Sequence, residues 1–372
     1  MPLPQSTRHF YYSKDGPGTY HNLAIKTSPL APPGAGQVLV KVHAVSLQAH
    51  DLNIAKDDEL GTDKNLIPCS DMAGKVFALG EAVSEWKVGD RVMANLVLDY
   101  LDGDLKASYL GNALSISVDE VLSEYRVFPA HALISIPEHL SYEEASTLPC
   151  AALTAFNALH GSEPMKAGDT VFIPGTGGVA ISALQFAIAA GAQVIISSSS
   201  DRKLAFAKVR GATHLVNYKT TPEWDQEVLK FTNGVGADHV LEMNGGPDSF
   251  ERSLKAVRMA GNVAIIGGSA GGNNPTPARP ICSTTFPNTL NPILAKVLKV
   301  RGILGAPVSL FKEMTAFMSA HPETTRPVID KVFEFEQARE AYAYLDAQQH
   351  VGKVAIRVAQ SCGPRYSNIF MT

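Results

Sequence analysis

The sequence has few cysteines, and none of them form a close pair. Small disulfide-built domains place many cysteines at close spacing, and a four-cysteine zinc site needs CxxC motifs. The four cysteines among the 372 residues lie far apart, at Cys69, Cys150, Cys282 and Cys362. Both kinds of scaffold are therefore excluded.

Charge of one sign is also lacking. Only 18% of the residues are charged, and the formal net charge is −4 at pH 7. Proteins that bind nucleic acid usually present a strongly basic patch, which this balance does not favour. We expect no nucleic-acid partner.

Long hydrophobic runs are absent as well. The longest apolar stretches, 148–159 and 179–190, each span about a dozen residues, whereas a membrane-spanning helix needs about 20. The N-terminal sequence MPLPQSTRHFYYSKDG has no basic segment followed by an apolar run, so it does not resemble a secretion signal. We expect a cytoplasmic protein with no membrane partner.

The sequence does contain enough apolar material for full-sized cores, since 45% of its residues are hydrophobic. Its pattern changes at about residue 168. Before that point, short strand-like segments such as Gln37–Val45 and Gly74–Leu79 are separated by Pro/Gly turns. Beyond it, strands and helices alternate. Residues 310–372 return to a mixed pattern, with a helix expected at 336–347 and a strand at 353–358.

The alternating part predicts an α/β fold, a parallel sheet with helices on both faces. The expected strands are Thr170–Ile173, Gln193–Ser197, His214–Asn217, His239–Glu242 and Asn262–Ile266. The expected helices are Val179–Ala190, Asp201–Arg210, one opened by the pair Thr221 and Pro222, and Asp248–Met259.

The turn between the first of these strands and its helix carries the strongest chemical signal. It reads Gly175-x-Gly177-x-x-Ala180, in the strand–turn–helix context that a dinucleotide fingerprint requires. Glycines permit a tight turn and a close approach of the pyrophosphate, and the helix N-terminus offers free N–H groups. An ordinary strand–helix turn is the alternative. The predicted cofactor-binding residues are Gly175, Thr176, Gly177, Gly178 and Val179.

The end of the next strand indicates which dinucleotide binds. An NAD site usually has Asp or Glu there, about 20 residues after the glycines, to hold the ribose 2′-OH. Here serines occupy the place, and the first acid, Asp201, is expected to cap the following helix. Small hydroxyls leave room for a 2′-phosphate, which nearby cationic or phenolic groups can bind. We predict NADP(H), with solvated surface charges as the alternative, and assign Ser198, Ser199, Arg202, Lys203 and Tyr218.

From about residue 20 to 358 the chain resembles the medium-chain dehydrogenase/reductase superfamily, specifically its zinc-free branch of quinone-oxidoreductase-like and alcohol-dehydrogenase-like proteins. The resemblance rests on VSLQAHDL (45–52), EWKVGDRV (85–92), LPCAALTAFNAL (148–159), KAGDTVFIPGTGGVAISALQFA (166–187), NYKTT (217–221), GADHVLE (236–242) and HVGKVAIRV (350–358). It implies a GroES-like β-barrel catalytic domain over 1–155 and 306–372, and a Rossmann dinucleotide-binding domain over 156–305. The active site should lie in the cleft between them.

The positions that hold catalytic zinc in the zinc-dependent members can be compared by this resemblance. They correspond to Gln48, Ser70 and Cys150. One amide, one hydroxyl and one thiol do not make a zinc site. Residues 93–125 contain no cysteine, so the structural zinc lobe of those enzymes is missing too. We predict no metal.

The resemblance also implies which groups act instead of a metal. Gln48 would donate to a carbonyl oxygen, and His50 occupies the proton-relay place and titrates near neutral pH. Asp51 is expected to anchor their loop, and Thr154 to lie beside the nicotinamide. A packing or surface role is the alternative for His50 and Thr154. The other implied cofactor contacts are Gly267, Ile303, Leu304 and Lys353.

Together these features predict a zinc-independent, NADPH-dependent oxidoreductase. It would transfer hydride to a small carbonyl compound, either an α,β-unsaturated carbonyl or a quinone. Two alternatives stay open: a zinc-free alcohol dehydrogenase or aldehyde reductase, and a cofactor-binding protein with little turnover. The segments 93–125 and 271–292 are expected to line the substrate pocket. A homodimer, paired through 300–307, is implied by the resemblance.

Overall fold

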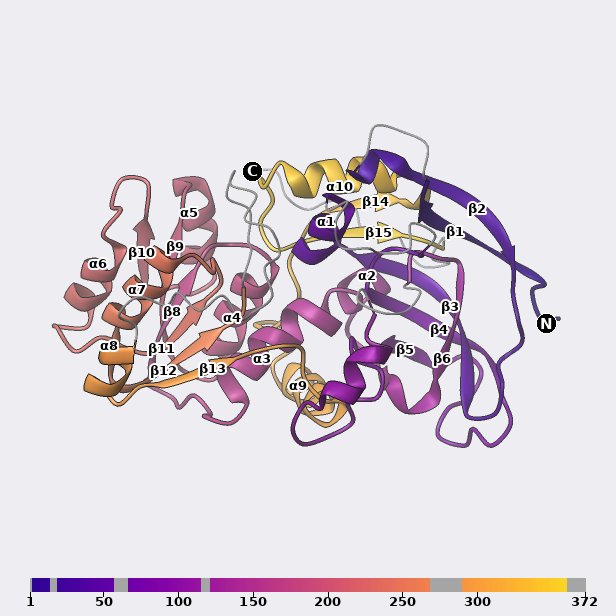
Figure 1. The fold of residues 1–372 in the computed structure, drawn as a ribbon, viewed down its shortest axis with the longest axis horizontal. Helices are drawn as coiled ribbons and strands as arrows, with labels where there is room; N and C mark the ends of the chain where they lie inside the picture. The colour runs from indigo at the N-terminus through magenta and orange to yellow at the C-terminus, as the bar shows by residue number, and fades with distance from the viewer. Residues whose placement is uncertain (1, 14–18, 57–65, 115–120, 268–289, 360–372) are drawn as a thin grey trace.

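The computed structural model describes residues 2–13, 19–56, 66–114, 121–267 and 290–359. Most of the expected pocket segment 271–292 and part of 93–125 therefore lie outside the described residues. Two large sheets organise the described residues, and helices lie between them (Figure 1).

The first sheet is parallel and six-stranded, in the order β10-β9-β8-β11-β12-β13. This is the order 3-2-1-4-5-6 of a Rossmann fold, so the predicted α/β class is confirmed. The strands are β8 Thr170–Pro174, β9 Gln193–Ser198, β10 His214–Asn217, β11 Ala237–Glu242, β12 Val257–Ile265 and β13 Lys299–Gly302. The helices that follow them are α4 Gly178–Ala189, α5 Asp201–Val209, α6 Trp224–Phe231, α7 Pro247–Ala256 and α8 Leu290–Ala295.

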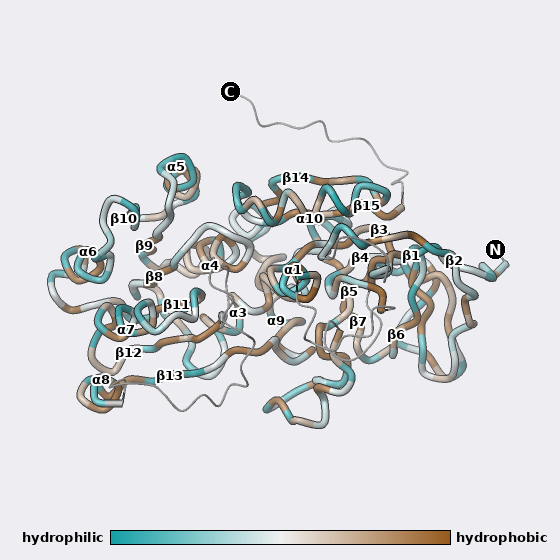
Figure 2. The backbone as a smooth tube through the Cα atoms, turned by 45° about the horizontal axis from the view of Figure 1, so that its top comes forward, coloured by the Kyte–Doolittle hydropathy of each residue, from teal (hydrophilic) through white to brown (hydrophobic). Residues whose placement is uncertain are grey.

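Side chains of these strands alternate between two cores, because successive residues of a strand point to opposite faces. Val171 and Ile173 of β8 join the core that contains α4 and α5. Phe172 joins the opposite core with α6 and α7, where it stacks on Trp224 at 4.6 Å between ring centroids. Both faces are covered, as a parallel sheet requires. Figure 2 shows apolar residues along these strands and more polar residues on the outer helices α5 and α6.

Two of the expected helix boundaries are wrong. The helix expected to open at Thr221 begins at Trp224, because the residues after β10 form a turn in which Thr221 N donates to Asn217 O. The helix expected to run through Met259 ends at Ala256. Val257 instead begins β12 and pairs with Ala237 of β11, so strand pairing overrides the helical pattern.

The second sheet combines both ends of the chain, in the order β14-β15-β3-β4-β5-β7, with β6 also paired to β3. Its strands are β3 Gln37–Ser46, β4 Asp71–Leu79, β5 Arg91–Ala94, β6 Tyr125–Pro129, β7 Leu133–Ser135, β14 Ile329–Glu334 and β15 Lys353–Arg357. β1 Ser6–Tyr12 and β2 Leu23–Pro29 form a separate hairpin, and α1 Ala49–Lys56 and α10 Ala338–Asp346 pack beside the sheet. The C-terminal strands therefore return to the sheet of the N-terminal half, while the domain limits at 155 and 305 stay a prediction.

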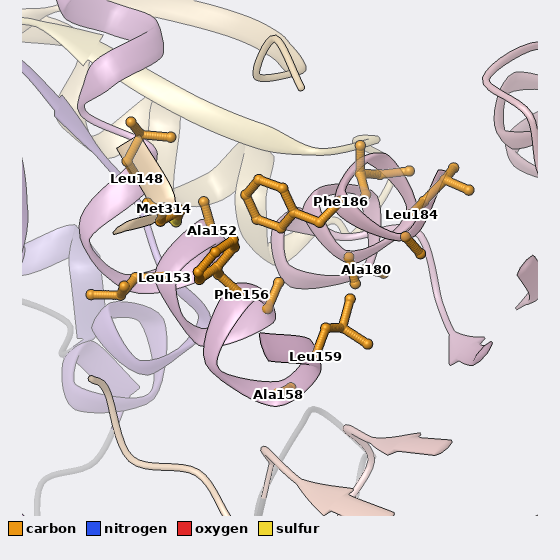
Figure 3. Packing of buried hydrophobic residues seen from close by; sticks show 14 of the residues in the cluster. Leu148, Ala152, Leu153, Phe156, Ala158, Leu159, Ala180, Leu184, Phe186 and Met314 are labelled. Atoms are coloured by element: carbon orange, nitrogen blue, oxygen red, sulfur yellow. The ribbon is translucent and has the colours of Figure 1, made fainter. Parts of the chain in front are cut away.

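The helices between the sheets form a shared apolar core. A short helix α2 Tyr142–Ala145 leads into a π-helical turn, Leu148–Ala152, which continues as α3 Leu153–His160. Figure 3 shows side chains of α3 facing those of α4, with Phe156 and Phe186 edge to face at 5.4 Å. α9 Val308–Ala320 adds Phe311 and Met314 to this core. Among the helices described, none is both long and apolar enough to cross a membrane.

Candidate active site

The loop that joins β3 to α1 is fixed by its own acid. Asp51 lies in the first turn of α1, and its Oδ2 accepts a hydrogen bond from the backbone N–H of Gln48 at 2.6 Å. The Asp51 side chain is fully buried. This contact is the N3-to-N-cap half of a capping box, and it holds Gln48 and His50 at the start of the helix.

A second acid, Asp71, gathers three separate segments of the chain. It is the first residue of β4 and is completely buried. It accepts hydrogen bonds from the Gln48 side-chain amide, from Ser70 Oγ at 2.9 Å and from Cys150 N at 3.1 Å. Sequence reasoning did not single out this residue. An acid at the start of a buried strand needs hydrogen-bond donors around it, so its position could have indicated a polar cluster.

His50 lies beside this cluster. Its Nε2 is 3.2 Å from Ser70 Oγ and 3.2 Å from Asp51 Oδ1. Burial lowers the pKa of His50, but the Asp51 carboxylate and a hydrogen bond with the Cys150 thiol raise it, and the net pKa lies well above its ordinary value. Because about one third of the side chain is exposed (34%), the imidazole can still exchange protons with solvent.

Lys353 connects the cluster to the glycine turn. Its ammonium is buried and donates to the backbone carbonyl of Leu47, in the loop before α1. A Cβ added to Gly178 would lie 2.5 Å from Lys353 Cδ, so the lysine stem passes directly over the start of α4. Burial lowers the pKa of Lys353, and Asp71 opposes that shift. Burial raises the pKa of Asp71 to about 6, and Lys353 opposes that shift in turn.

The residues at the zinc positions do not fit a zinc ion. Gln48 and Ser70 offer an amide and a hydroxyl, and both are hydrogen-bonded to Asp71. A catalytic zinc needs three good N, S or O ligands and an open position. Across the described ranges, no group of three or more His, Cys, Asp or Glu side chains could hold a metal ion.

The glycine turn lies at the C-terminal end of β8. Gly175 has a φ of +92°, a conformation that favours glycine, and its N–H donates to Ser197 O at 2.8 Å. Thr176 O accepts from Gly352 N at 3.0 Å, so the C-terminal segment is attached to the turn. No described side chain caps α4 at Gly177, which leaves N–H groups that an anion can bind.

The residues assigned to the 2′-phosphate lie at the end of β9, in α5 and just after β10. Ser198 is buried at the end of that strand, and Tyr218, 42% exposed, donates its backbone N–H to Ser198 O at 3.1 Å. Arg202 Nη2 donates to Gln349 O at 3.3 Å, and Lys203 Nζ donates to Gln348 O at 2.7 Å. Ser199 is half-buried between the strand and α5.

The expectation that Asp201 caps α5 is wrong. The N-cap position is Ser200, and Asp201 is the first helical residue. Its Oδ1 instead accepts from Asn217 Nδ2 at 2.7 Å, because Asn217 ends the neighbouring strand β10.

The residues assigned to the nicotinamide lie at the same edge of the parallel sheet. Gly267 follows β12, and a Cβ there would lie 2.2 Å from Met243 O, so only glycine fits. Ile303 follows β13, and its N–H donates to Ile265 O at 2.8 Å, whereas Leu304 is about half exposed (51%). Thr154 is buried in α3, four residues after Cys150. In open α/β sheets, ligands bind at this carboxyl edge.

Comparison with known proteins now places the chain. Residues 34–138 match the model for the alcohol dehydrogenase GroES-like domain, and residues 178–320 match the model for zinc-binding dehydrogenase. A zinc-type alcohol dehydrogenase-like protein of Schizosaccharomyces pombe is 43% identical over 327 residues, which cover 87% of this chain and 91% of that protein. The chain belongs to the medium-chain dehydrogenase/reductase superfamily.

Solved structures of this superfamily agree. A structure described as an alcohol dehydrogenase from Sinorhizobium meliloti 1021 has a TM-score of 0.84 and 33% identity, and the match covers 96% of this chain and all of that one (100%). An NAD-dependent alcohol dehydrogenase has a TM-score of 0.80 and 28% identity, with coverage of 95% and 100%. The protein is therefore an oxidoreductase of the medium-chain type, and the expected pairing of a GroES-like domain with a Rossmann domain is confirmed.

Proposed function

We propose that this protein is a zinc-independent, NADP(H)-dependent oxidoreductase that reduces an α,β-unsaturated carbonyl compound or a quinone. The observation that carries the proposal is the donor set around Asp71. By the family resemblance, Gln48 and Ser70 correspond to zinc ligands of the metal-dependent relatives, and both donate hydrogen bonds to the Asp71 carboxyl group. Alcohol oxidation in such relatives uses zinc to lower the alcohol pKa, so reduction suits these residues better.

The chain's own groups would then stabilise charge and deliver a proton. A bound nicotinamide supplies the hydride. Gln48 has a second amide hydrogen beside the one that binds Asp71, and it would donate to the substrate oxygen as negative charge develops. His50, partly exposed, would pass a proton to the product. Thr154 would fix the ring position from α3.

The preference for NADP(H) rests on the end of β9. Ser198 and Ser199 replace the acid that an NAD site needs, and Arg202 and Lys203 lie next in the chain. The 28% identical relative is described as NAD-dependent. NAD and NADP share the nicotinamide and differ in the 2′-phosphate, so the experiment must test whether this protein binds that phosphate. The side chains of Arg202 and Lys203 donate to the backbone carbonyls of Gln349 and Gln348. A phosphate is a charged acceptor and would compete successfully with these neutral carbonyls for the two cations.

A second candidate is an aldehyde reductase or alcohol dehydrogenase that works without zinc. The relatives that favour it are described as alcohol dehydrogenases, including one from Geobacillus stearothermophilus with 29% identity over 334 residues. In this case His50 would act as the base for the alcohol proton. Reduction of NADP⁺ by alcohols after exhaustive chelation is the measurement that separates it from the first candidate.

The deciding experiment follows NADPH and NADH oxidation by chelator-treated protein with enones, quinones and aldehydes. We expect turnover with NADPH and an enone or quinone, undiminished by chelation. Loss of activity on chelation, restored by zinc, would refute the proposal. Tight NADPH binding without turnover on any compound would instead favour a cofactor-binding protein.

We also propose a cytoplasmic homodimer paired through 300–307, a segment that begins within β13. This strand is at the end of the parallel sheet, and no described strand pairs with its outer edge. Light scattering on the purified protein tests the dimer. A monomeric mass across micromolar concentrations would refute it.

A further inference from the structure

Two buried asparagines hold consecutive carbonyl oxygens in the segment that crosses from one sheet to the other. Asn157 Nδ2, from α3, donates to Gly305 O at 2.7 Å. Asn95 Nδ2, just after β5, donates to Ala306 O at 3.2 Å. Asn157 is 9% exposed and Asn95 is fully buried. The crossing segment is therefore fixed from both sides at adjacent peptide units.

Arg301 fixes the orientation of the Asn157 amide. Its Nη1 donates to Asn157 Oδ1 at 3.0 Å, and its Nη2 donates to Asn157 O at 2.5 Å. Because a guanidinium donates and never accepts, the Asn157 oxygen must face Arg301 and its NH₂ group must face Gly305. A Cβ on Gly161 would lie 2.8 Å from Arg301 Nη2, so the glycine after α3 leaves room for this contact.

These residues link two parts of the proposed nicotinamide site. Asn157 lies three residues after Thr154, so both occupy one face of α3. Arg301 is on β13, and the segment it helps to hold begins immediately afterwards with Ile303 and Leu304. One amide and one guanidinium thus set the distance between the helix that carries Thr154 and the backbone that carries Ile303.

We propose that Asn157 and Arg301 are positioning residues, which hold Ile303–Gly305 against the nicotinamide end of the cofactor. The inference rests on the proposed function, since it requires a nicotinamide at this edge of the sheet. The proposal predicts that substituting either residue weakens binding of the nicotinamide half of the cofactor. Binding of the adenosine and phosphate half, which is expected at the glycine turn and β9, should stay unchanged. A merely structural pin would affect both halves alike.

The test compares a whole cofactor with a fragment that lacks only its nicotinamide. Binding of NADPH and of 2′-phospho-ADP-ribose is measured by calorimetry for wild type and for Asn157→Asp, with NADH and ADP-ribose as the parallel pair. The substitution keeps the acceptor for Arg301 but turns the donor into an oxygen that repels Gly305 O. We expect the Kd of NADPH to rise about tenfold while that of the fragment stays unchanged.

Two further variants complete the design. Arg301→Lys loses the forked contact with milder disturbance, so the same pattern is expected at about threefold. Lys299→Ala is the matched control, because Lys299 is on the same strand and contacts Glu163 at the surface. It should change neither Kd.

The outcomes separate this inference from the proposed function. Equal losses for cofactor and fragment, or no loss for either, would overturn the positioning role while leaving the proposed function intact. Wild-type protein that binds neither pair of ligands would refute the proposed function and this inference together.

Discussion

The glycine turn and the Asp71 cluster meet at Lys353, yet they are built from different materials. The turn offers backbone groups: a glycine at positive φ and a helix N-terminus that no described side chain caps. The cluster offers side chains, in which one buried carboxylate holds an amide, a hydroxyl and a backbone N–H from three segments. We therefore expect side-chain changes in the cluster to abolish catalysis while cofactor binding is kept. Changes on the cofactor side should weaken cofactor binding while the catalytic groups stay in place.

The largest expected effect comes from removing the centre of the cluster. Asp71→Ala leaves Gln48, Ser70 and Cys150 N without their shared acceptor, so the Gln48 amide is no longer aimed. We expect kcat to fall at least about 100-fold in steady-state assays, and the Kd of NADPH to change by less than about threefold. Asp225→Ala is the control, since Asp225 is also a buried acid but pairs with Arg252 of α7. A Kd that worsens as much as kcat would break the comparison.

The complementary change removes charge at the cofactor side. In the double variant Arg202→Ala/Lys203→Ala, we expect the KM for NADPH to rise about 30-fold and that for NADH to stay within about threefold. The contacts with Gln348 O and Gln349 O are lost for both cofactors, so the ratio of the two KM values isolates the 2′-phosphate. Lys208→Ala, exposed on the same helix, serves as control. Equal losses for both cofactors would contradict the NADP(H) assignment.

The difference between the two regions also explains what sequence could predict. The turn is local: its strand, glycines and helix lie within 170–189, so spacing alone located Gly175, Gly177 and the parallel sheet. The carboxyl-edge segments of β12 and β13 came from the family resemblance. Their contact with the nicotinamide stays a prediction.

The cluster is not local, and sequence reasoning found only part of it. Asp71 binds residues 23 positions before it and 79 positions after it. Its role depends on the register that places β4 beside β3, which no short motif encodes. The cofactor contact of Lys353 stays a prediction, while its hydrogen bond to Leu47 O, in the loop before α1, was not foreseen. The Asn157–Arg301 contact was missed for the same reason.

Neighbouring glycines of the turn give a sharper, smaller test. A Cβ at Gly177 would meet nothing within 4 Å, whereas one at Gly178 would meet Lys353 Cδ at 2.5 Å and Ala151 Cβ at 3.2 Å. We expect Gly177→Ala to raise the Kd of NADPH about tenfold with unchanged stability, because the methyl group occupies the pyrophosphate's path. Gly178→Ala should lower the free energy of unfolding by about 1 kcal/mol. Calorimetry measures the Kd of NADPH, and urea unfolding measures the free energy of unfolding. If the two variants changed both quantities equally, the packing of Lys353 against Gly178 would not distinguish the two glycines.

The last prediction concerns the charge on Asp71. Its folded-state pKa of about 6 lies above the ordinary value of 3.8, because burial disfavours the carboxylate. The folded protein therefore binds more protons than the unfolded chain between these pH values, and the contribution of Asp71 to stability is lost as pH rises through that window. Between pH 5 and 7.5 the loss amounts to about 1 kcal/mol.

Asp71→Asn removes this titration while it keeps the shape of the side chain. Urea unfolding at pH 5 and at pH 7.5 should show the variant gaining about 1 kcal/mol relative to wild type at the higher pH. Asp99→Asn is the control: hydrogen bonds from Asn112 and His131 lower the pKa of that acid, so it is ionised in both states at pH 5 and pH 7.5 and its difference from wild type should not change between them. A difference between Asp71→Asn and wild type that does not change with pH would mean that Asp71 stays ionised at little cost. Lys353 would then compensate the negative charge of Asp71 fully. The two residues would form a buried ion pair, and Asp71 would not be a buried acid with a raised pKa.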